Sequence, residues 1–249
     1  MTAFENPALA AFAAQLGAEL VFAQVLIRRD GTSFAFRHIE DAGALAESLR
    51  TIAIEELRAL TQTTETGAFR PLKSAPNLRR GWFARATNIT ELGTALDRLY
   101  PGALADWFAA RAAQPPVTSY REFTARQTGM YRITTFPDDP RAAQITRACC
   151  DARFCLKRRL WTVPSLATDT AADKSLIPCL EPCALLLEFA RKVVRWEQEG
   201  ELPSTVSPEE ARQLREKLNQ TGSSVRAADF ESSENPRRLA LLQQLATRD

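Results

Sequence analysis

Residues 19–39, ELVFAQVLIRRDGTSFAFRHI, decide the fold class because they introduce β-structure into a chain whose other patterns are mostly helical. Side chains at alternate positions form two sets, as on the two faces of a strand: Val21, Ala23, Val25 and Ile27 against Phe22, Gln24, Leu26 and Arg28. The Asp30-Gly31 pair readily supplies the positive φ angles of a type I′ turn. The segment therefore predicts a β-hairpin.

The segments that follow the hairpin are mostly helical in pattern. Apolar residues recur at near-helical spacing through residues 41–62, which predicts an amphipathic helix and a β-β-α opening. Pro101-Gly102 separates two further helical patterns. We expect helices over 90–99 and 103–113, an ordered loop over 69–82 and a strand over 130–136.

The second half of the chain carries helical patterns with clear starts. Pro140 suits the first position of a helix over 140–150, and an apolar stripe predicts a helix over 184–199. A capped surface helix over 207–222 and a short docking helix over 235–249 follow. The expected fold is α+β: residues 1–138 form a domain of hairpin and helices, and residues 139–249 form a mainly helical domain that carries the cysteines.

Charge and hydropathy limit the classes of partner. The 249 residues include 32 basic and 30 acidic side chains, so the whole molecule has no strong attraction to nucleic acid or membrane. The N-terminal residues show no basic segment before an apolar one, and no stretch approaches the ~20 apolar residues of a membrane span. We therefore expect a cytoplasmic protein that uses neither nucleic acid nor membrane.

All five cysteines fall within residues 149–183, at Cys149, Cys150, Cys155, Cys179 and Cys183. An odd number with an adjacent pair does not suggest a disulfide framework, and in a reducing compartment clustered cysteines indicate metal ligands or redox centres. Starting from Cys149 the pattern is C-x5-C followed by C-x3-C, and starting from Cys150 it begins with C-x4-C. Two such pairs can enclose an iron–sulfur cluster or one tetrahedral ion.

The spacing favours a [4Fe–4S] cluster over zinc. Structural zinc sites usually have tight C-x2-C pairs, which the first pair fits poorly, whereas cluster ligands vary more in spacing. The pattern C-x5-C with a later C-x3-C also resembles that of the sirohaem-dependent sulfite and nitrite reductases. Zinc and buried inert thiols remain the alternatives. Cys149 is the favoured ligand on spacing, with Cys150 as its alternate.

Charge provides a separate argument for the cluster. Four thiolates around an oxidised 2+ core leave a net charge of −2, and reduction makes it −3, so nearby cations should stabilise it. Three basic residues follow Cys155 by two to four positions, and we expect them to bind on the side of the cofactor: Lys157, Arg158 and Arg159. Cys183 follows Pro182 at a predicted helix start, where free N–H groups favour a thiolate.

Several segments resemble the bacterial chelatase-associated 4Fe–4S proteins, in which a sirohydrochlorin cobaltochelatase-like domain precedes a stabilising domain and an iron–sulfur domain. They are RPLKSAPNLRRGW, LDRLYPGALADW, RQTGMYRIT, CLKRRLW and IPCLEPC, and the match as a whole would cover about residues 19–200. The resemblance implies a 4Fe–4S cluster held by cysteines of the second domain. The chain departs from the family in having one histidine, His38, and we expect no preceding chelatase domain, so stand-alone chelatase activity is not expected.

Other residues allow different functions. The loop at 69–82 carries Arg70, Lys73, Arg79 and Arg80 and ends in Trp82, which suits either a tetrapyrrole carboxylate or a solvated loop with one anchoring tryptophan. His38 is expected to be an ordinary structural residue. The sequence motifs of the common enzyme classes do not occur, which leaves open whether the chain is an enzyme.

Two hypotheses follow for the whole chain. In the first, it binds a [4Fe–4S] cluster for electron transfer or a structural or sensing role in tetrapyrrole (sirohaem or cobalamin) metabolism, with a tetrapyrrole-pathway or redox protein as partner. In the second, it is a zinc-stabilised module in which Arg79, Arg80 and Arg158 recognise an acidic partner or nucleic acid.

Overall fold

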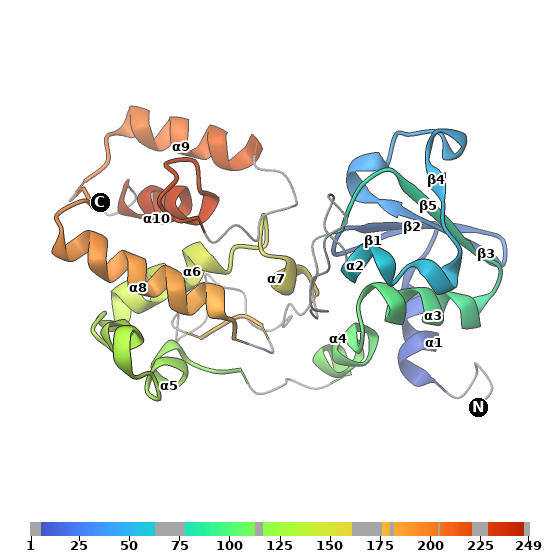
Figure 1. The fold of residues 1–249 in the computed structure, drawn as a ribbon, viewed down its shortest axis with the longest axis horizontal. Helices are drawn as coiled ribbons and strands as arrows, with labels where there is room; N and C mark the ends of the chain where they lie inside the picture. The colour runs from blue at the N-terminus through green and yellow to red at the C-terminus, as the bar shows by residue number, and fades with distance from the viewer. Residues whose placement is uncertain are drawn as a thin grey trace. The chain divides into compact units, whose positions relative to one another are not determined.

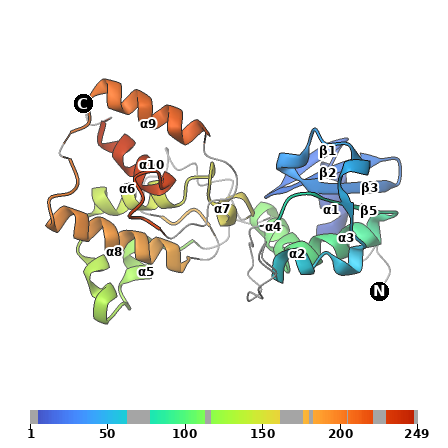
Figure 2. The same ribbon diagram turned by 45° about the horizontal axis from the view of Figure 1, so that its top comes forward.

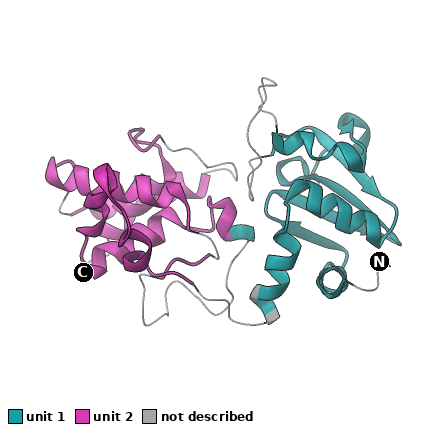
Figure 3. Cartoon of the chain, turned by 60° about the horizontal axis from the view of Figure 1, so that its bottom comes forward, with its two compact units in different colours: residues 1–114, 159–161 teal, residues 115–158, 162–249 magenta. Residues whose placement is uncertain are grey.

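The computed structural model describes residues 6–62, 78–112, 117–160, 176–179, 182–203, 205–220 and 229–246. It contains two compact units, residues 1–114 with 159–161 and residues 115–158 with 162–249 (Figure 3). The first unit has a sheet and helices and the second is mainly helical, which confirms the predicted α+β class (Figure 1). The predicted domain boundary at residue 138 stays a prediction, because compactness does not test which part folds on its own.

The sheet of the first unit has five strands in the order β1-β2-β3-β5-β4. Neighbouring strands are antiparallel from β1 to β5, and the short β4 is parallel to β5. The strands are β1 (Glu19–Phe22), β2 (Val25–Asp30), β3 (Ser33–His38), β4 (Arg50–Thr51) and β5 (Trp82–Ala86).

The predicted hairpin contains two turns rather than one. Phe22 pairs with Val25, so the first turn consists of Ala23 and Gln24, and Ala23 has a φ of 53°. Asp30 pairs with Ser33, which places the second turn at Gly31-Thr32, one residue later than predicted. Gly31 has a φ of 60°, a conformation that glycine adopts without steric cost. The first predicted strand is therefore two strands, β1 and β2.

Gln24 joins the β1–β2 turn to two distant parts of the unit. Its side chain is fully buried, and its Oε1 accepts a hydrogen bond from the backbone N–H of Leu78 at 2.9 Å. Its backbone N–H donates to the Tyr100 hydroxyl at 3.2 Å, and its carbonyl accepts from Ile39 N–H at 2.8 Å. These bonds satisfy buried polar groups and fix the turn despite the unfavourable φ of Ala23.

The helices α1 (Pro7–Gln15), α3 (Ile89–Leu99) and α4 (Ala103–Ala112) lie on the same side of the sheet (Figure 2). Asn6 and Asn88 cap the first two through their side-chain oxygens. Gly102, with a φ of 74°, turns the chain between α3 and α4. The predicted helices over 90–99 and 103–113 are confirmed to within a residue at each end.

The prediction of one helix over residues 41–62 was wrong. The structure has three short 3₁₀ turns there, η2 (Ile39–Asp41), η3 (Ala46–Ser48) and η4 (Ile54–Glu56), with β4 between the last two and a four-residue α2 (Ala59–Gln62) at the end. The N–H groups of Arg50 and Ile52 donate to the carbonyls of Gly81 and Phe83, beside and within β5, at 3.0 and 2.8 Å. Sheet hydrogen bonding therefore interrupts the helical pattern.

The second unit is built around α6 (Asp139–Cys149), which contacts both α8 (Ala184–Gln198) and α10 (Pro236–Ala246). The other helices are α5 (Tyr120–Thr124), α9 (Pro208–Gln220) and α7 (Leu156–Leu160), whose last two residues are grouped with the first unit. The predicted helices over 140–150, 184–199, 207–222 and 235–249 are confirmed where the structure describes them. In the described part of the chain, no helix is both long and apolar enough to cross a membrane.

The predicted strand over 130–136 was also wrong, because η5 (Gly129–Thr135) is a 3₁₀ helix that packs on α8. The carbonyl of Thr134 accepts a hydrogen bond from the buried Tyr120 hydroxyl at 2.8 Å. Residues of strand composition form a strand only where a neighbouring strand pairs with them, and here a helix is the neighbour.

Replacing Gln24 with Met should lower the free energy of unfolding by about 1–3 kcal/mol, because the variant leaves the buried Leu78 N–H without its acceptor. Urea denaturation followed by circular dichroism measures the change. Gln15→Met on exposed α1 surface is the matched control and should have little effect. Equal stability of the two variants would contradict the role given to Gln24.

Candidate metal centre

The first two cysteines lie at the C-terminal end of α6. Cys149 is the last residue of the helix and Cys150 its C-cap, whose N–H donates to Thr146 O at 2.9 Å. A tight turn follows, in which the N–H of Cys155 donates to Asp151 O at 2.8 Å. An ion pair between Arg153 and Asp151 at 2.6 Å supports this turn. The turn brings Cys155 back toward the end of α6.

Cys179 lies in the segment 176–179, which is anchored on two sides. Leu176 pairs with Ser119 in an isolated bridge, and Ile177 N–H donates to Thr118 O at 2.9 Å. On the other side the buried Arg158 of α7 donates from Nη1 to Pro178 O at 3.4 Å. Arg158 thus links the stretch after Cys155 to the residue before Cys179.

Cys183 is the N-cap residue of α8, so the helix begins where the Pro182-Cys183 pair predicted. Burial is the main influence on the Cys183 thiol and raises its pKa. The backbone N–H of Leu186 and the positive charge of Lys157 act in the opposite direction. Both would favour a thiolate at this position when a metal replaces the proton.

All five thiols interact electrostatically with others of the set. The pKa of Cys150 is raised well above its usual value by a hydrogen bond to Cys149, by burial, and by Cys149, Cys155 and Cys179 as neighbours. Cys149 and Cys155 likewise raise the pKa of Cys183. In the described part of the chain none of the five cysteines forms a disulfide, and all but the half-buried Cys183 are buried. The two halves of the sequence pattern therefore meet in one region of the second unit.

The sequence analysis missed Arg237, a fully buried residue in the first turn of α10. Its Nε donates to the carbonyl of Cys149 at 3.2 Å, and its guanidinium lies over the Phe154 ring at 5.4 Å from the centroid. Although burial tends to raise the pKa of Cys149, hydrogen bonds from Cys150 and Arg237 and the charge of Arg237 lower it. No spacing rule connects Arg237 to residues 88 positions earlier, so no sequence signal pointed to it.

The three basic residues predicted beside the cluster have different surroundings. All lie in α7, where Arg158 is buried and Lys157 and Arg159 are half-buried. The charge of Lys157 lowers the pKa of Cys183, and Arg158 donates a hydrogen bond to the carbonyl of Pro178, next to Cys179. The burial of Arg158 does not suit the recognition of an acidic partner on the surface.

The donor set fits an iron–sulfur cluster in its chemistry. Five thiols share a mostly buried region with Arg237, Lys157 and the N-terminus of α8, which can offset thiolate charge. Among the described residues, no group of three or more His, Cys, Asp and Glu side chains is arranged to hold a metal ion.

The other sequence candidates lie in the first unit. Arg80 pairs with Glu40 at 2.9 Å, while Trp82 is buried and donates from Nε1 to Arg79 O at 2.7 Å. Trp82 is therefore the anchoring residue of the loop and not an open stacking surface. His38 is buried at the end of β3, where burial lowers its pKa. Arg70 and Lys73 lie outside the described residues.

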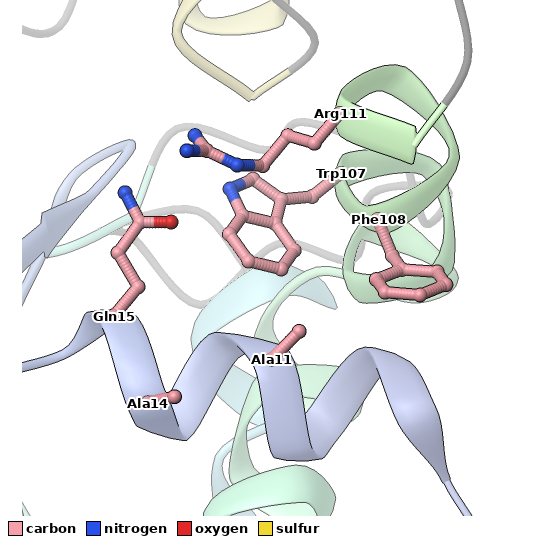
Figure 4. Close-up of a pocket in the computed structure, with 6 residues that line it drawn as sticks. All are labelled: Ala11, Ala14, Gln15, Trp107, Phe108 and Arg111. Carbon is pink, nitrogen blue, oxygen red and sulfur yellow. The ribbon is translucent and has the colours of Figure 1, made fainter.

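The first unit also has an open cavity of about 580 Å³ between α1 and α4 (Figure 4). Arg111 lies over the ring of Trp107 at 5.2 Å, and Trp107 meets Phe12 edge-on. The cavity is lined by Ala11, Ala14, Gln15, Trp107, Phe108 and Arg111. None of these residues was a sequence candidate.

Two family models match the chain and divide it between them. The DR2241 stabilising domain matches residues 6–111, which include the sheet and the helices α1, α3 and most of α4. A 4Fe-4S iron-sulfur cluster binding domain matches residues 112–192, which contain all five cysteines. Residues 193–249, with α9 and α10, lie outside both matches.

A solved structure with similarity to the chain is DR2241 from Deinococcus radiodurans, described as a multi-domain protein with structural similarity to chelatases but also with two additional novel domains. The identity is 26% and the TM-score 0.52, over 76% of this chain and 41% of DR2241. The chain thus spans less than half of that protein. No curated protein matches the chain.

The two matches follow one another as the sequence resemblance implied, and the second carries the cysteines. The chain therefore joins a DR2241 stabilising domain to a 4Fe–4S iron–sulfur cluster binding domain, and its structure is similar to part of DR2241.

Proposed function

We propose that the chain holds one [4Fe–4S] cluster through Cys149, Cys155, Cys179 and Cys183, with Cys150 as the alternate to Cys149. The observation that supports this set is that thiols from three separate segments lie near enough to raise one another's pKa values. These segments are the end of α6 with its following turn, the segment 176–179 and the start of α8. Four thiolates are the usual ligands of such a cluster.

Cys149 is preferred to Cys150 for two reasons. Its C-x5-C spacing to Cys155 matches the pattern on which the cluster was expected. It is also the cysteine to which Arg237 donates hydrogen bonds. Cys150 then keeps its proton and donates to the Cys149 sulfur, a bond that suits a sulfur which also bears negative charge.

The residues around the thiols would position and stabilise the ligands. Arg158 fixes the carbonyl of Pro178 and with it the segment that carries Cys179. Lys157 and the α8 N-terminus favour the thiolate of Cys183. Arg159, on the same short helix, is proposed as a further positive charge on the cofactor side. When bound, the cluster supplies one-electron redox chemistry or a rigid link between the segments.

For the biological role, we propose electron transfer or a structural or sensing task connected with tetrapyrrole metabolism. The similarity to DR2241, a protein described as structurally similar to chelatases, supports this connection. A tetrapyrrole-pathway or redox protein would be the partner. A cytoplasmic location belongs to the proposal, because cysteines outside disulfides and iron–sulfur clusters suit a reducing compartment.

Protein purified without oxygen should be brown and contain about four iron and four acid-labile sulfide per chain, as a [4Fe–4S] cluster requires. Metal analysis and an EPR spectrum of the dithionite-reduced protein measure this. Stoichiometric zinc in a colourless protein would instead support the zinc-stabilised module. Protein that takes up neither iron nor zinc, even after reconstitution, would contradict both.

Serine at Cys155, Cys179 or Cys183 should abolish or strongly reduce cluster loading, because each change removes a soft thiolate ligand. Of Cys149→Ser and Cys150→Ser, only the former should do so. Iron content and the visible absorption of anaerobically reconstituted variants measure the loss, and circular dichroism checks that each variant is folded. Normal loading of Cys149→Ser together with loss in Cys150→Ser would reverse the assignment of the pair.

A further inference from the structure

Arg237 is a buried positive charge for which the family matches give no explanation. Arg237 is 1% exposed and belongs to α10, which lies outside both matched regions. Burying a guanidinium is costly unless nearby groups compensate its charge and its hydrogen bonds. The groups that surround Arg237 therefore indicate what its charge interacts with.

These neighbours come from the cysteine region. Nε donates to the carbonyl of Cys149 at 3.2 Å, and the guanidinium packs over the ring of Phe154, next to Cys155. The buried cation thus faces the end of α6 and the turn that follows, where two of the proposed ligands lie.

The position of Arg237 is fixed at several points. Its backbone N–H donates to the Asn235 side chain at 3.0 Å, and that side chain donates to Asp229 O at 2.9 Å. Farther along α10, Gln244 donates from Nε2 to Gln144 O of α6 at 3.3 Å. Arg237 meets the C-terminal end of α6 while Gln244 meets its middle, so the two helices run antiparallel. A charge held in this way is preorganised toward the thiols.

We propose that Arg237 is a positioning residue that supplies the buried counter-charge of the cluster, holds the Cys149 end of α6 and raises the cluster's reduction potential. The inference rests on the proposed function. One-electron reduction takes the cluster with its four thiolates from a net charge of −2 to −3, so a fixed cation nearby stabilises the reduced form more than the oxidised one. The assignment also gives α10 a role in the metal centre.

The test is a potentiometric titration of anaerobic full-length protein, with dithionite as the electron donor and the EPR signal of the reduced cluster as readout. Arg237→Met removes the charge at similar volume, and Arg237→Lys keeps it. The matched control is Arg238→Gln, which removes a charge at the next residue, where the guanidinium lies over Trp196 and Nη1 donates to Glu231 O.

Arg237→Met should make reduction less favourable by about tenfold in the equilibrium constant, or about 59 mV for one electron, whereas Arg237→Lys and Arg238→Gln should stay close to the wild-type potential. Potentials of Arg237→Met and Arg238→Gln that both equal the wild type would overturn the inference while leaving the proposed function intact. A wild-type chain without a cluster would instead remove the proposed function itself.

A second comparison decides the case in which Arg237→Met holds no cluster. If Arg237→Lys then loads a cluster at the wild-type potential, the positive charge is what the site requires, and the inference is supported. If the Lys variant also fails to load while its circular dichroism matches that of the wild type, the shape of arginine and not its charge is needed, and the counter-charge role is wrong.

Discussion

The proposed cluster requires the second unit to accommodate negatively charged sulfur away from water. Thiolates are costly to bury, and several together repel one another unless cations and N–H donors compensate them. The helices of this unit meet that requirement from different directions. The end of α6 presents two cysteines, α8 begins at a third, α7 carries basic residues, and α10 adds the buried Arg237. Packing and electrostatics therefore converge on the same region.

Local chemistry made part of this arrangement predictable from sequence. Helix α8 follows from the apolar stripe over residues 184–199, and the strands near Gly31 follow from alternation and turn chemistry. The cysteine spacing indicated two halves of one site without any coordinates. These features depend on residues close together in the chain, whose preferences the sequence displays directly.

The errors arose where distant contacts outweighed local preference. Leu45 fits the helical spacing of residues 41–62, yet it is 73% exposed, while Ile52 follows a strand that pairs with β5. Residues 129–135 have strand composition but pack against α8. Arg237 is the clearest case, because its role depends on folding α10 against α6. Which of many arginines becomes buried beside the thiols is decided by tertiary structure alone.

The long separation between Arg237 and the cysteines also affects the order of events during synthesis. Arg237 is added 54 residues after Cys183, which at ribosomal rates is a delay of roughly 3–11 s. During that interval every thiol of the region has been made but its buried cation has not. A nascent chain therefore presents sulfur ligands before the guanidinium can balance them, and metal delivered early would enter a site whose charge compensation is still incomplete.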